Sequence, residues 1–273
     1  MSMRRALLCV MLGALAAGAW LTAGAAARAQ GDGVAVPILL YHRFGHTAPD
    51  SMWVTDDTFA WQLRYLEDHH YTVIPLRTLV AFLRGKGPAP PPRAVVITSD
   101  DGHRSVYTDM APLVVRYRIP VTLFIYPSAI SSAAYAMTWP ELAQLVRTGL
   151  FDVQSHTYWH PNFNHERARL SPSQYDAFVR IQLTTSRAVL ERRLGIHVDM
   201  LAWPFGIYHD DLIARAASAG YIAAFTIERR SVTPADRLLA LPRYIVTNAD
   251  RGAAFARLLE AHDSERAPPA GKR

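Results

Sequence analysis

The chain has 273 residues, of which 50% are hydrophobic and 19% are charged, a composition typical of a globular protein and unlike that of disordered or fibrous chains. Much of the net charge of +6 lies at the two ends, because residues 1–29 hold three arginines and no acid, and the last ten residues hold three cations and one acid. The body of the chain is therefore nearly neutral, which argues against a nucleic-acid partner.

The first 29 residues are organised like a secretory signal peptide. Arg4 and Arg5 precede an apolar run over residues 6–26, and residues 27–29 (ARA) place alanine at the two positions that a signal peptidase reads. We predict a signal peptide over 1–29 and an exported protein, periplasmic or extracellular. An uncleaved membrane anchor is the alternative, since the run is near the ~20 residues needed to span a bilayer. The only cysteine, Cys9, lies in this segment, so the mature chain has no disulfide.

The rest of the chain alternates short apolar runs with segments of helical periodicity. The runs predict strands at 36–41, 71–74, 94–98, 121–126, 151–154, 200–203, 221–225 and 244–246. Helices are predicted behind the capping residues Thr55 and Asp56 and at 78–84, 105–117, 140–147, 173–194, 210–219 and 251–261.

Strands separated by helices predict an α/β fold, a parallel sheet covered on both faces. About eight such strands fit one closed barrel better than two domains. We expect this single domain over residues 30–262, followed by a disordered tail over 263–273, which is polar and contains a proline pair.

Polar residues follow several of the predicted strands. The strand at 94–98 is followed by residues 99–103 (SDDGH), the strand at 151–154 by residues 155–161 (SHTYWHP), and the first strand ends at His42. In a βα barrel the carboxyl ends of the strands converge on the face that carries the active site. We therefore expect these side chains to lie close together.

Two aspartates and two histidines in these segments suit a metal site. Asp100 and Asp101 are adjacent, and neighbouring carboxylates repel each other unless a cation or a proton intervenes; a pair of acids at a helix N-terminus is the alternative. His156 and His160 are four residues apart, which would place both imidazoles on one face of a helical turn. One carboxylate with two imidazoles is typical of a catalytic metal centre, and the second aspartate is then free to act as a base.

The same segments resemble the motifs of a known family. Residues 98–103 (TSDDGH) are similar to the T-F-D-D-G motif of the polysaccharide deacetylases (carbohydrate esterase family 4, the NodB-homology fold), and residues 155–161 to its H-[S/T]-x-x-H-P motif. The resemblance covers roughly residues 36–261. It implies a distorted (β/α) barrel that removes acetyl groups from N- or O-acetylated glycans with a divalent metal.

The resemblance also implies a role for each motif residue. Asp101, His156 and His160 would hold the metal, with Zn²⁺ favoured and Co²⁺, Ni²⁺ or Fe²⁺ as alternatives. Asp100 would be the general base, and a backbone N–H near His103 would stabilise the oxyanion.

Two departures from the family pattern are informative. In residues 202–206 (AWPFG), Ala202 stands at the arginine position of the family's R-x-P-Y-G motif, so the usual partner of the catalytic aspartate is missing. The late strand (LPRYIVTN, 241–248) lacks the family's histidine, whereas the first strand ends at His42. This arrangement is similar to a circularly permuted subgroup, the poly-β-1,6-N-acetylglucosamine deacetylases of biofilm export systems. We predict that His42 protonates the leaving amine; a buried histidine bonded to a carbonyl is the alternative.

The resemblance favours an N-deacetylase of an extracytoplasmic glycan, with poly-β-1,6-N-acetylglucosamine as the first choice and peptidoglycan, chitin-like or O-acetylated glycans as alternatives. Four aromatic residues are candidates to stack on sugar rings, with packing at the barrel mouth as the alternative: Trp203, Phe205, Tyr158 and Trp159. The expected partners are the acetylated polysaccharide and polysaccharide export or cell-envelope machinery, and the protein is expected to be a monomer.

Two other classes of protein stay open. A glycoside hydrolase would need two carboxylates about 5–10 Å apart across a cleft, whereas the second aspartate here is adjacent to the first. An inactive glycan-binding module is favoured by the missing arginine at position 202 and opposed by the intact aspartate pair and histidine pair.

Overall fold

A curled parallel sheet forms the centre of the fold in the computed structural model, which describes residues 33–264. Within these residues eight strands join in the order β10–β1–β5–β6–β7–β8–β9, with β4 paired to β5. Their bounds are β1 (Ile38–Tyr41), β4 (Thr72–Val73), β5 (Ala94–Asp100), β6 (Val121–Ile125), β7 (Phe151–Ser155), β8 (Met200–Ala202), β9 (Ala223–Phe225) and β10 (Tyr244–Ile245). The predicted signal peptide (1–29) lies outside the described residues.

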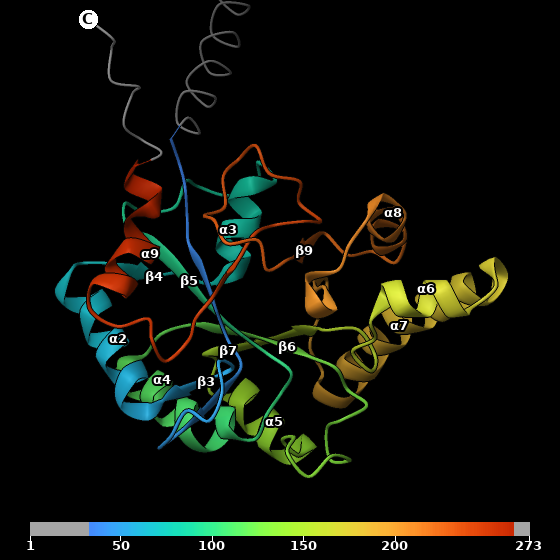
Figure 1. Cartoon of the computed structure of the whole chain (residues 1–273), viewed down its shortest axis with the longest axis horizontal. Helices are drawn as coiled ribbons and strands as arrows, with labels where there is room; N and C mark the ends of the chain where they lie inside the picture. The colour runs from blue at the N-terminus through green and yellow to red at the C-terminus, as the bar shows by residue number, and fades with distance from the viewer. Residues whose placement is uncertain (1–32, 265–273) are drawn as a thin grey trace, which may run out of the picture. The chain divides into compact units, whose positions relative to one another are not determined.

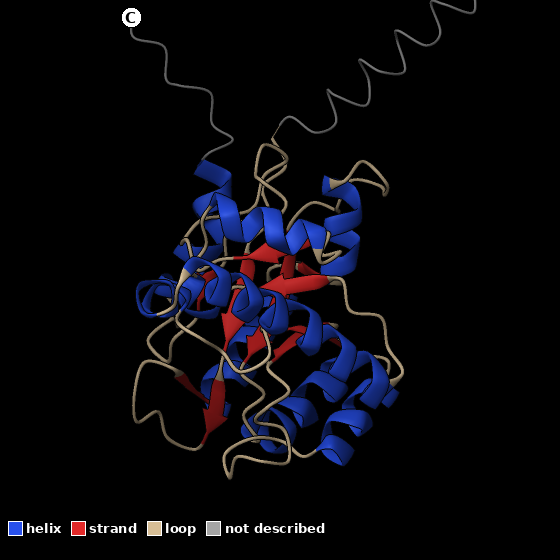
Figure 2. Ribbon diagram, turned by 90° about the vertical axis from the view of Figure 1, so that its right-hand side faces the viewer, coloured by secondary structure: helices blue, strands red, loops and turns tan. Residues whose placement is uncertain are grey.

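The helices lie around the outside of this sheet (Figures 1 and 2). They are α2 (Asp56–Asp68), α3 (Leu76–Leu83), α4 (Ala111–Tyr117), α5 (Trp139–Arg147), α6 (Phe163–Arg169), α7 (Pro172–Leu194), α8 (Asp210–Ser218) and α9 (Ala253–Ser264), with a π-helical turn η1 (Val106–Met110) before α4 and a 3₁₀ turn η2 (Pro204–Gly206) after β8. Helix α2 begins as predicted, because the Thr55 side chain accepts the N–H of Thr58. Among the described residues, no helix is long and apolar enough to cross a membrane.

The predicted distorted barrel is confirmed, but as a half-barrel rather than a closed one. Strands β9 and β10 form no ladder with each other; instead Phe225 makes a single parallel bridge to Leu241. The N–H of Ala224 donates to the carbonyl of Leu238, and the N–H of Leu241 donates back to Ala224. The segment before β10 therefore fills the gap in the sheet without continuing it.

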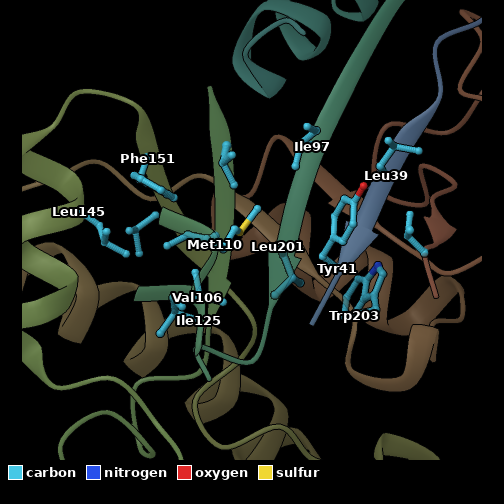
Figure 3. Packing of buried hydrophobic residues seen from close by; sticks show 14 of the residues in the cluster. Leu39, Tyr41, Ile97, Val106, Met110, Ile125, Leu145, Phe151, Leu201 and Trp203 are labelled. Atoms are coloured by element: carbon cyan, nitrogen blue, oxygen red, sulfur yellow. The ribbon is translucent and has the colours of Figure 1, made fainter. Parts of the chain in front are cut away.

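Continuous apolar runs place the core on both faces of the sheet. All four residues of β1 and all seven of β5 are buried, as expected for parallel strands covered by helices. Leu39 of β1, Ile97 of β5 and Leu201 of β8 are among the side chains packed together in Figure 3. This packing fixes the positions of the strand ends from which the polar segments emerge.

Three features differ from the sequence-based prediction. Helix α6 was not predicted, and neither was a small parallel ribbon of β2 (Arg43–Gly45) and β3 (Trp53–Thr55). Helix α9 ends at Ser264, two residues into the predicted tail (263–273), whose remaining residues 265–273 lie outside the described part. The ribbon is anchored beside the sheet, because the N–H of Phe44 donates to Ser105 Oγ at 2.8 Å and that of Thr55 to Asn248 Oδ1 at 3.0 Å.

Candidate active site

The three predicted metal ligands come together at the carboxyl ends of β5 and β7. Asp101 Oδ1 lies 3.6 Å from His156 Nε2 and 3.7 Å from His160 Nε2. One ligand atom from each residue lies within 4.8 Å of the others, and within residues 33–264 this is the only such group of three or more His, Cys, Asp or Glu side chains. We call Asp101, His156 and His160 the metal-ligand group.

The loop that carries the two histidines is not the predicted helical turn. Thr157 and His160 adopt left-handed backbone conformations, with φ of 64° and 60°. Side chains satisfy the N–H groups of this loop: Gln182 Oε1 accepts from Tyr158 and Trp159, and Thr157 Oγ1 accepts from His160. The spacing of four residues therefore brings the imidazoles together through a strained loop.

Backbone strain is concentrated at this end of the sheet. Asp101 has φ of 74° and Phe205 has φ of 56°, so with Thr157 and His160 the site holds four of the eight non-glycine residues with positive φ in the described part of the chain. Gly102 follows at φ 76°, and a Cβ there would lie 3.0 Å from Ile125 Cδ1. Such conformations persist only where the surrounding structure enforces them, and they cluster at functional sites.

The orientation of His156 suits metal binding. Its Nδ1 lies 2.8 Å from the carbonyl oxygen of Ala202, which can only accept, so Nδ1 carries the proton and Nε2 is free as a ligand. A backbone carbonyl that orients a ligating imidazole in this way is a usual feature of metal sites. The donor set of two imidazole nitrogens and one carboxylate oxygen fits Zn²⁺ and similar divalent ions.

Arg243 takes the place of the arginine missing at position 202. Its Nη1 and Nη2 donate to Asp100 Oδ1 and Oδ2 at 2.8 and 2.7 Å, and its Nε donates to the carbonyl of Thr226 at 3.0 Å. Arg243 is 0% exposed and lies just before β10. Arg243 was not among the predicted site residues, although an arginine in the late strand together with Ala202 was the available signal.

The two adjacent aspartates have different electrostatics. Burial alone would raise the pKa of Asp100, but the charges of Arg243 and His156 and the hydrogen bonds from Arg243 lower it below its ordinary value of 3.8. Burial and the charge of Asp100 raise the pKa of Asp101 to about 7. Asp100 is thus an ionised acceptor held by the guanidinium of Arg243. A bound cation would lower the pKa of Asp101 again and stabilise its charged form.

His42 lies at the end of β1 with no hydrogen bond to a carbonyl. Its Nδ1 is buried and has no hydrogen-bond partner in the described part of the chain. Burial lowers the pKa of His42 to about 4, the charge of Asp100 opposes this, and the charge of Arg243 adds to it. The imidazole is therefore neutral near pH 7 and becomes an acid only after it takes up a proton.

The four predicted sugar-stacking residues occupy different environments. The prediction that Trp203 stacks on a sugar is wrong, because this side chain is fully buried and its indole N–H donates to the carbonyl of Leu239 at 3.0 Å. Figure 3 shows Trp203 within the core. Phe205 is 56% exposed, and its ring lies 4.6 Å from that of His160. Trp159 is exposed and Tyr158 half-buried in the loop between the two histidines. Phe205, Trp159 and Tyr158 are therefore free to contact a ligand.

An acidic pair and two imidazoles at the carboxyl ends of a parallel half-barrel define a hydrolase with one candidate metal centre. The chain belongs to the polysaccharide deacetylase family, whose model matches residues 87–224. It is therefore a glycan deacetylase, a hydrolase of carbon–nitrogen bonds other than peptide bonds.

Curated relatives include two enzymes named poly-beta-1,6-N-acetyl-D-glucosamine N-deacetylase. The one from Staphylococcus epidermidis is 27% identical over 200 residues, covering 71% of this chain and 68% of the relative. One from Staphylococcus aureus is 24% identical over 214 residues, covering 77% and 72%.

Solved structures show the same fold. The Streptococcus pyogenes deacetylase PplD, in complex with acetate, has a TM-score of 0.74 at 22% identity and covers 83% of this chain and 99% of that one. IcaB from Ammonifex degensii has a TM-score of 0.72 at 24% identity, covering 83% and 97%. These similarities support the half-barrel described above.

Proposed function

We propose that this protein removes N-acetyl groups from poly-β-1,6-N-acetylglucosamine outside the cytoplasm, with a divalent metal held by Asp101, His156 and His160. The observation that carries the proposal is the ionised Asp100, clamped by Arg243, beside the metal-ligand group. The names of the relatives support the choice of polymer. Peptidoglycan, chitin-like and O-acetylated glycans are the alternatives that the test below separates.

The chemistry divides between the metal and the side chains of this chain. Asp101, His156 and His160 would hold a divalent metal, Zn²⁺ by preference, which would supply a Lewis acid and lower the pKa of water at the site. Asp100 accepts the proton of the attacking water at a carboxylate oxygen, and Arg243 keeps that carboxylate ionised and oriented. His42 is neutral at the start, so it would take up the proton that Asp100 accepted from the water and pass it to the leaving amine.

A backbone donor is available for the substrate oxygen. His103 bridges Ala136 in an antiparallel arrangement whose hydrogen bonds come from the neighbouring residues, Arg104 N–H to Tyr135 and Met137 N–H to Gly102. In this pattern the N–H of His103 points away from the bridge. We assign it the oxyanion-binding role, which needs a donor fixed before the charge develops.

The cellular setting is part of the proposal. The signal-like residues 1–29 support export to the periplasm or the cell exterior. There the protein would act as a monomer on the acetylated polymer, alongside polysaccharide export or cell-envelope machinery.

Acetate release from an acetylated β-1,6-glucosamine pentamer, with and without a chelator, tests the proposal. We expect release that the chelator abolishes and that added Zn²⁺ restores. Peptidoglycan fragments, chitin oligomers and O-acetylated glycans are run in parallel. Release from one of these and none from the pentamer would overturn the choice of polymer. Release that resists the chelator would overturn the metal assignment. Binding of the pentamer without any release would indicate an inactive glycan-binding module.

A further inference from the structure

A second group of residues lies beside the metal-ligand group, and the mechanism above uses none of their side chains, although it uses the backbone N–H of His103. It consists of Arg43, Trp53, His103 and Tyr135, and we call it the ribbon cluster. Arg43 of β2 and Trp53 of β3 are directly paired in the parallel register of the ribbon, so their side chains lie on the same face of it. The Trp53 ring lies 5.2 Å from the ring of His103, at an angle of 74°.

Arg43 has a charge that the described part of the chain does not neutralise. Its Nε is buried without a hydrogen-bond partner, and none of the ion pairs within residues 33–264 includes it. The charge lies close to the site, because Arg43 is paired with Trp53, whose ring contacts the ring of His103, two residues after Asp101. An arginine next to a catalytic centre and without an acidic partner is available to a ligand.

His103 presents a fixed donor to the same space. Its Nδ1 accepts the N–H of Ser105 at 3.2 Å and lies 2.8 Å from Ser105 Oγ, which itself accepts the N–H of Phe44. Because a backbone N–H can only donate, Nδ1 is the acceptor nitrogen and the proton sits on Nε2. In the described residues this Nε2–H has no acceptor, so it is free to bind an oxygen atom of a ligand.

Aromatic rings frame these two donors. A Cβ on Gly45 would lie 3.3 Å from the Trp53 ring, so a glycine lets that ring lie against the ribbon backbone. Tyr135 is 46% exposed, its ring is nearly parallel to that of His103, and its hydroxyl lies 2.6 Å from that of Tyr126. The Tyr126 ring is in turn 5.4 Å from that of His160. The ribbon cluster is thus continuous with the metal-ligand group.

We propose that the ribbon cluster binds the sugar next to the one being deacetylated, and that Arg43 rejects a neighbour that already carries a free amine. The inference rests on the proposed function. Aromatic faces with a few fixed donors suit an N-acetylated pyranose, which offers C–H faces and oxygen acceptors. A glucosamine neighbour would instead bring an ammonium group, which the guanidinium repels and which has no acceptor to offer. The enzyme therefore leaves glucosamines separated by acetylated sugars rather than in runs.

The order of glucosamines in the product tests this inference. The acetylated pentamer is treated with wild-type protein, Arg43→Met, Arg43→Lys or Arg64→Met until two acetyl groups per chain are removed, and the products are sequenced by mass spectrometry. The reaction is run near pH 6, where an amine with a pKa of about 7.7–8 is charged. Arg64 is the matched control, because it is exposed on α2.

We expect wild-type protein to place the two glucosamines mainly on non-adjacent sugars. Arg43→Met should raise the share of adjacent pairs on the order of tenfold, the scale of one like-charge contact that water partly screens. Arg43→Lys, which keeps the charge, should retain the wild-type pattern, and so should Arg64→Met. Added salt should raise the share of adjacent pairs for the wild-type protein and have no effect on Arg43→Met.

Two results would overturn the inference, and they differ in what they imply for the proposed function. An unchanged order of glucosamines with Arg43→Met, at any overall rate, would reject the role of Arg43 and leave the proposed function in place. No acetate release from the pentamer by wild-type protein would reject the proposed function and, with it, this inference. Thermal unfolding of each variant shows whether a slow variant is merely misfolded, and Arg43→Lys then provides the comparison at full charge.

Discussion

The two ends of the strands differ in how they treat charged side chains. At the amino ends, Arg77 of α3 lies 2.9 Å from Asp152 of β7 and 2.9 Å from Asp199, which precedes β8. The Gln154 side chain there accepts the N–H groups of Asp199 and Met200 at 3.1 and 2.9 Å. This end is held together by partners within the chain.

At the carboxyl ends the pairing is incomplete. Asp100 has Arg243, whereas the ion-pair partners of Asp101 among the described residues are two imidazoles whose pKa values are lowered, chiefly by burial. The buried Nδ1 of His42 and Nε of Arg43 have no partner among the described residues. Polar groups at the amino ends are paired within the chain, which indicates a role in stability. Polar groups without a partner at the carboxyl ends are candidates to bind a metal and a substrate. Substitutions at each end of the strands test whether the two ends differ in this way.

The largest effect is expected from the metal ligands. His156→Ala, His160→Ala or Asp101→Asn should each remove bound metal and abolish acetate release, because two protein ligands are too few for a stable site. Elemental analysis of the purified variants measures the metal. His165→Ala is the control, since His165 is exposed on α6. Near-stoichiometric metal in any of the three ligand variants would remove that residue from the site.

The next effect comes from Asp100. Asp100→Asn should keep the metal and lose turnover by about 10²–10⁴-fold, the range attributed to a general base, because an amide accepts hydrogen bonds yet cannot take the proton. Metal content and acetate release are measured together. If Asp100→Asn loses metal while Asp101→Asn keeps it, the two roles are reversed.

His42→Ala should lose about 10²-fold in turnover with metal retained, since the leaving amine then lacks its acid. A substrate with a leaving group that needs no protonation, such as an activated acetyl ester, should be cleaved by this variant nearly as fast as by wild-type protein. Wild-type rates on the acetylated pentamer would show that another residue supplies the proton.

A substitution of Arg243 tests whether its charge tunes the pKa of Asp100. Arg243→Met leaves the buried Asp100 unpaired, a change that typically destabilises a protein by about 3–5 kcal/mol. The pKa of Asp100, now lowered, would rise, so the acid limb of the rate–pH profile should move to higher pH. The paired carboxylate stabilises the fold above the ordinary pKa of 3.8, and this stability is lost as pH falls through the lower folded value. An unmoved acid limb in a folded variant would show that Arg243 does not tune Asp100.

The smallest effect is expected at the opposite end. Arg77→Met should lower the free energy of unfolding by about 1 kcal/mol, since the Arg77 side chain is 40% exposed and its ion pairs are partly screened. The value of kcat/KM should stay within twofold of wild type. A large loss of activity with normal stability would mean that the two ends are coupled.

Much of the fold was predictable because the strands are apolar runs that local pattern identifies. The predicted strand at 94–98 and the observed β5 share four buried aliphatic or alanine positions, Ala94 to Ile97, and differ only in two polar residues at the end. The ribbon of β2 and β3 was not predicted, because each strand has three residues, too few to show an alternation of apolar and polar side chains.

The candidate site was predictable where its chemistry lies within one motif. Asp101, His156 and His160 meet as expected, although the helical turn between the histidines was wrong because Gln182, on another helix, stabilises the loop. Arg243 and Arg43 depend on contacts between distant parts of the chain, which spacing along the sequence does not reveal. Burial of Trp203 is likewise a property of the packed fold.

The pair of Asp100 and Arg243 joins positions 143 apart in the chain, from the carboxyl end of β5 to the residue just before β10. All three proposed metal ligands lie before residue 161, whereas the proposed base is paired with a guanidinium from residue 243. A chain that ends before residue 243 would hold the three proposed ligands and lack the side chain that orients Asp100. If Asp100 is the base, catalysis would therefore depend on the docking of β10, because the segment that leads into this strand carries Arg243.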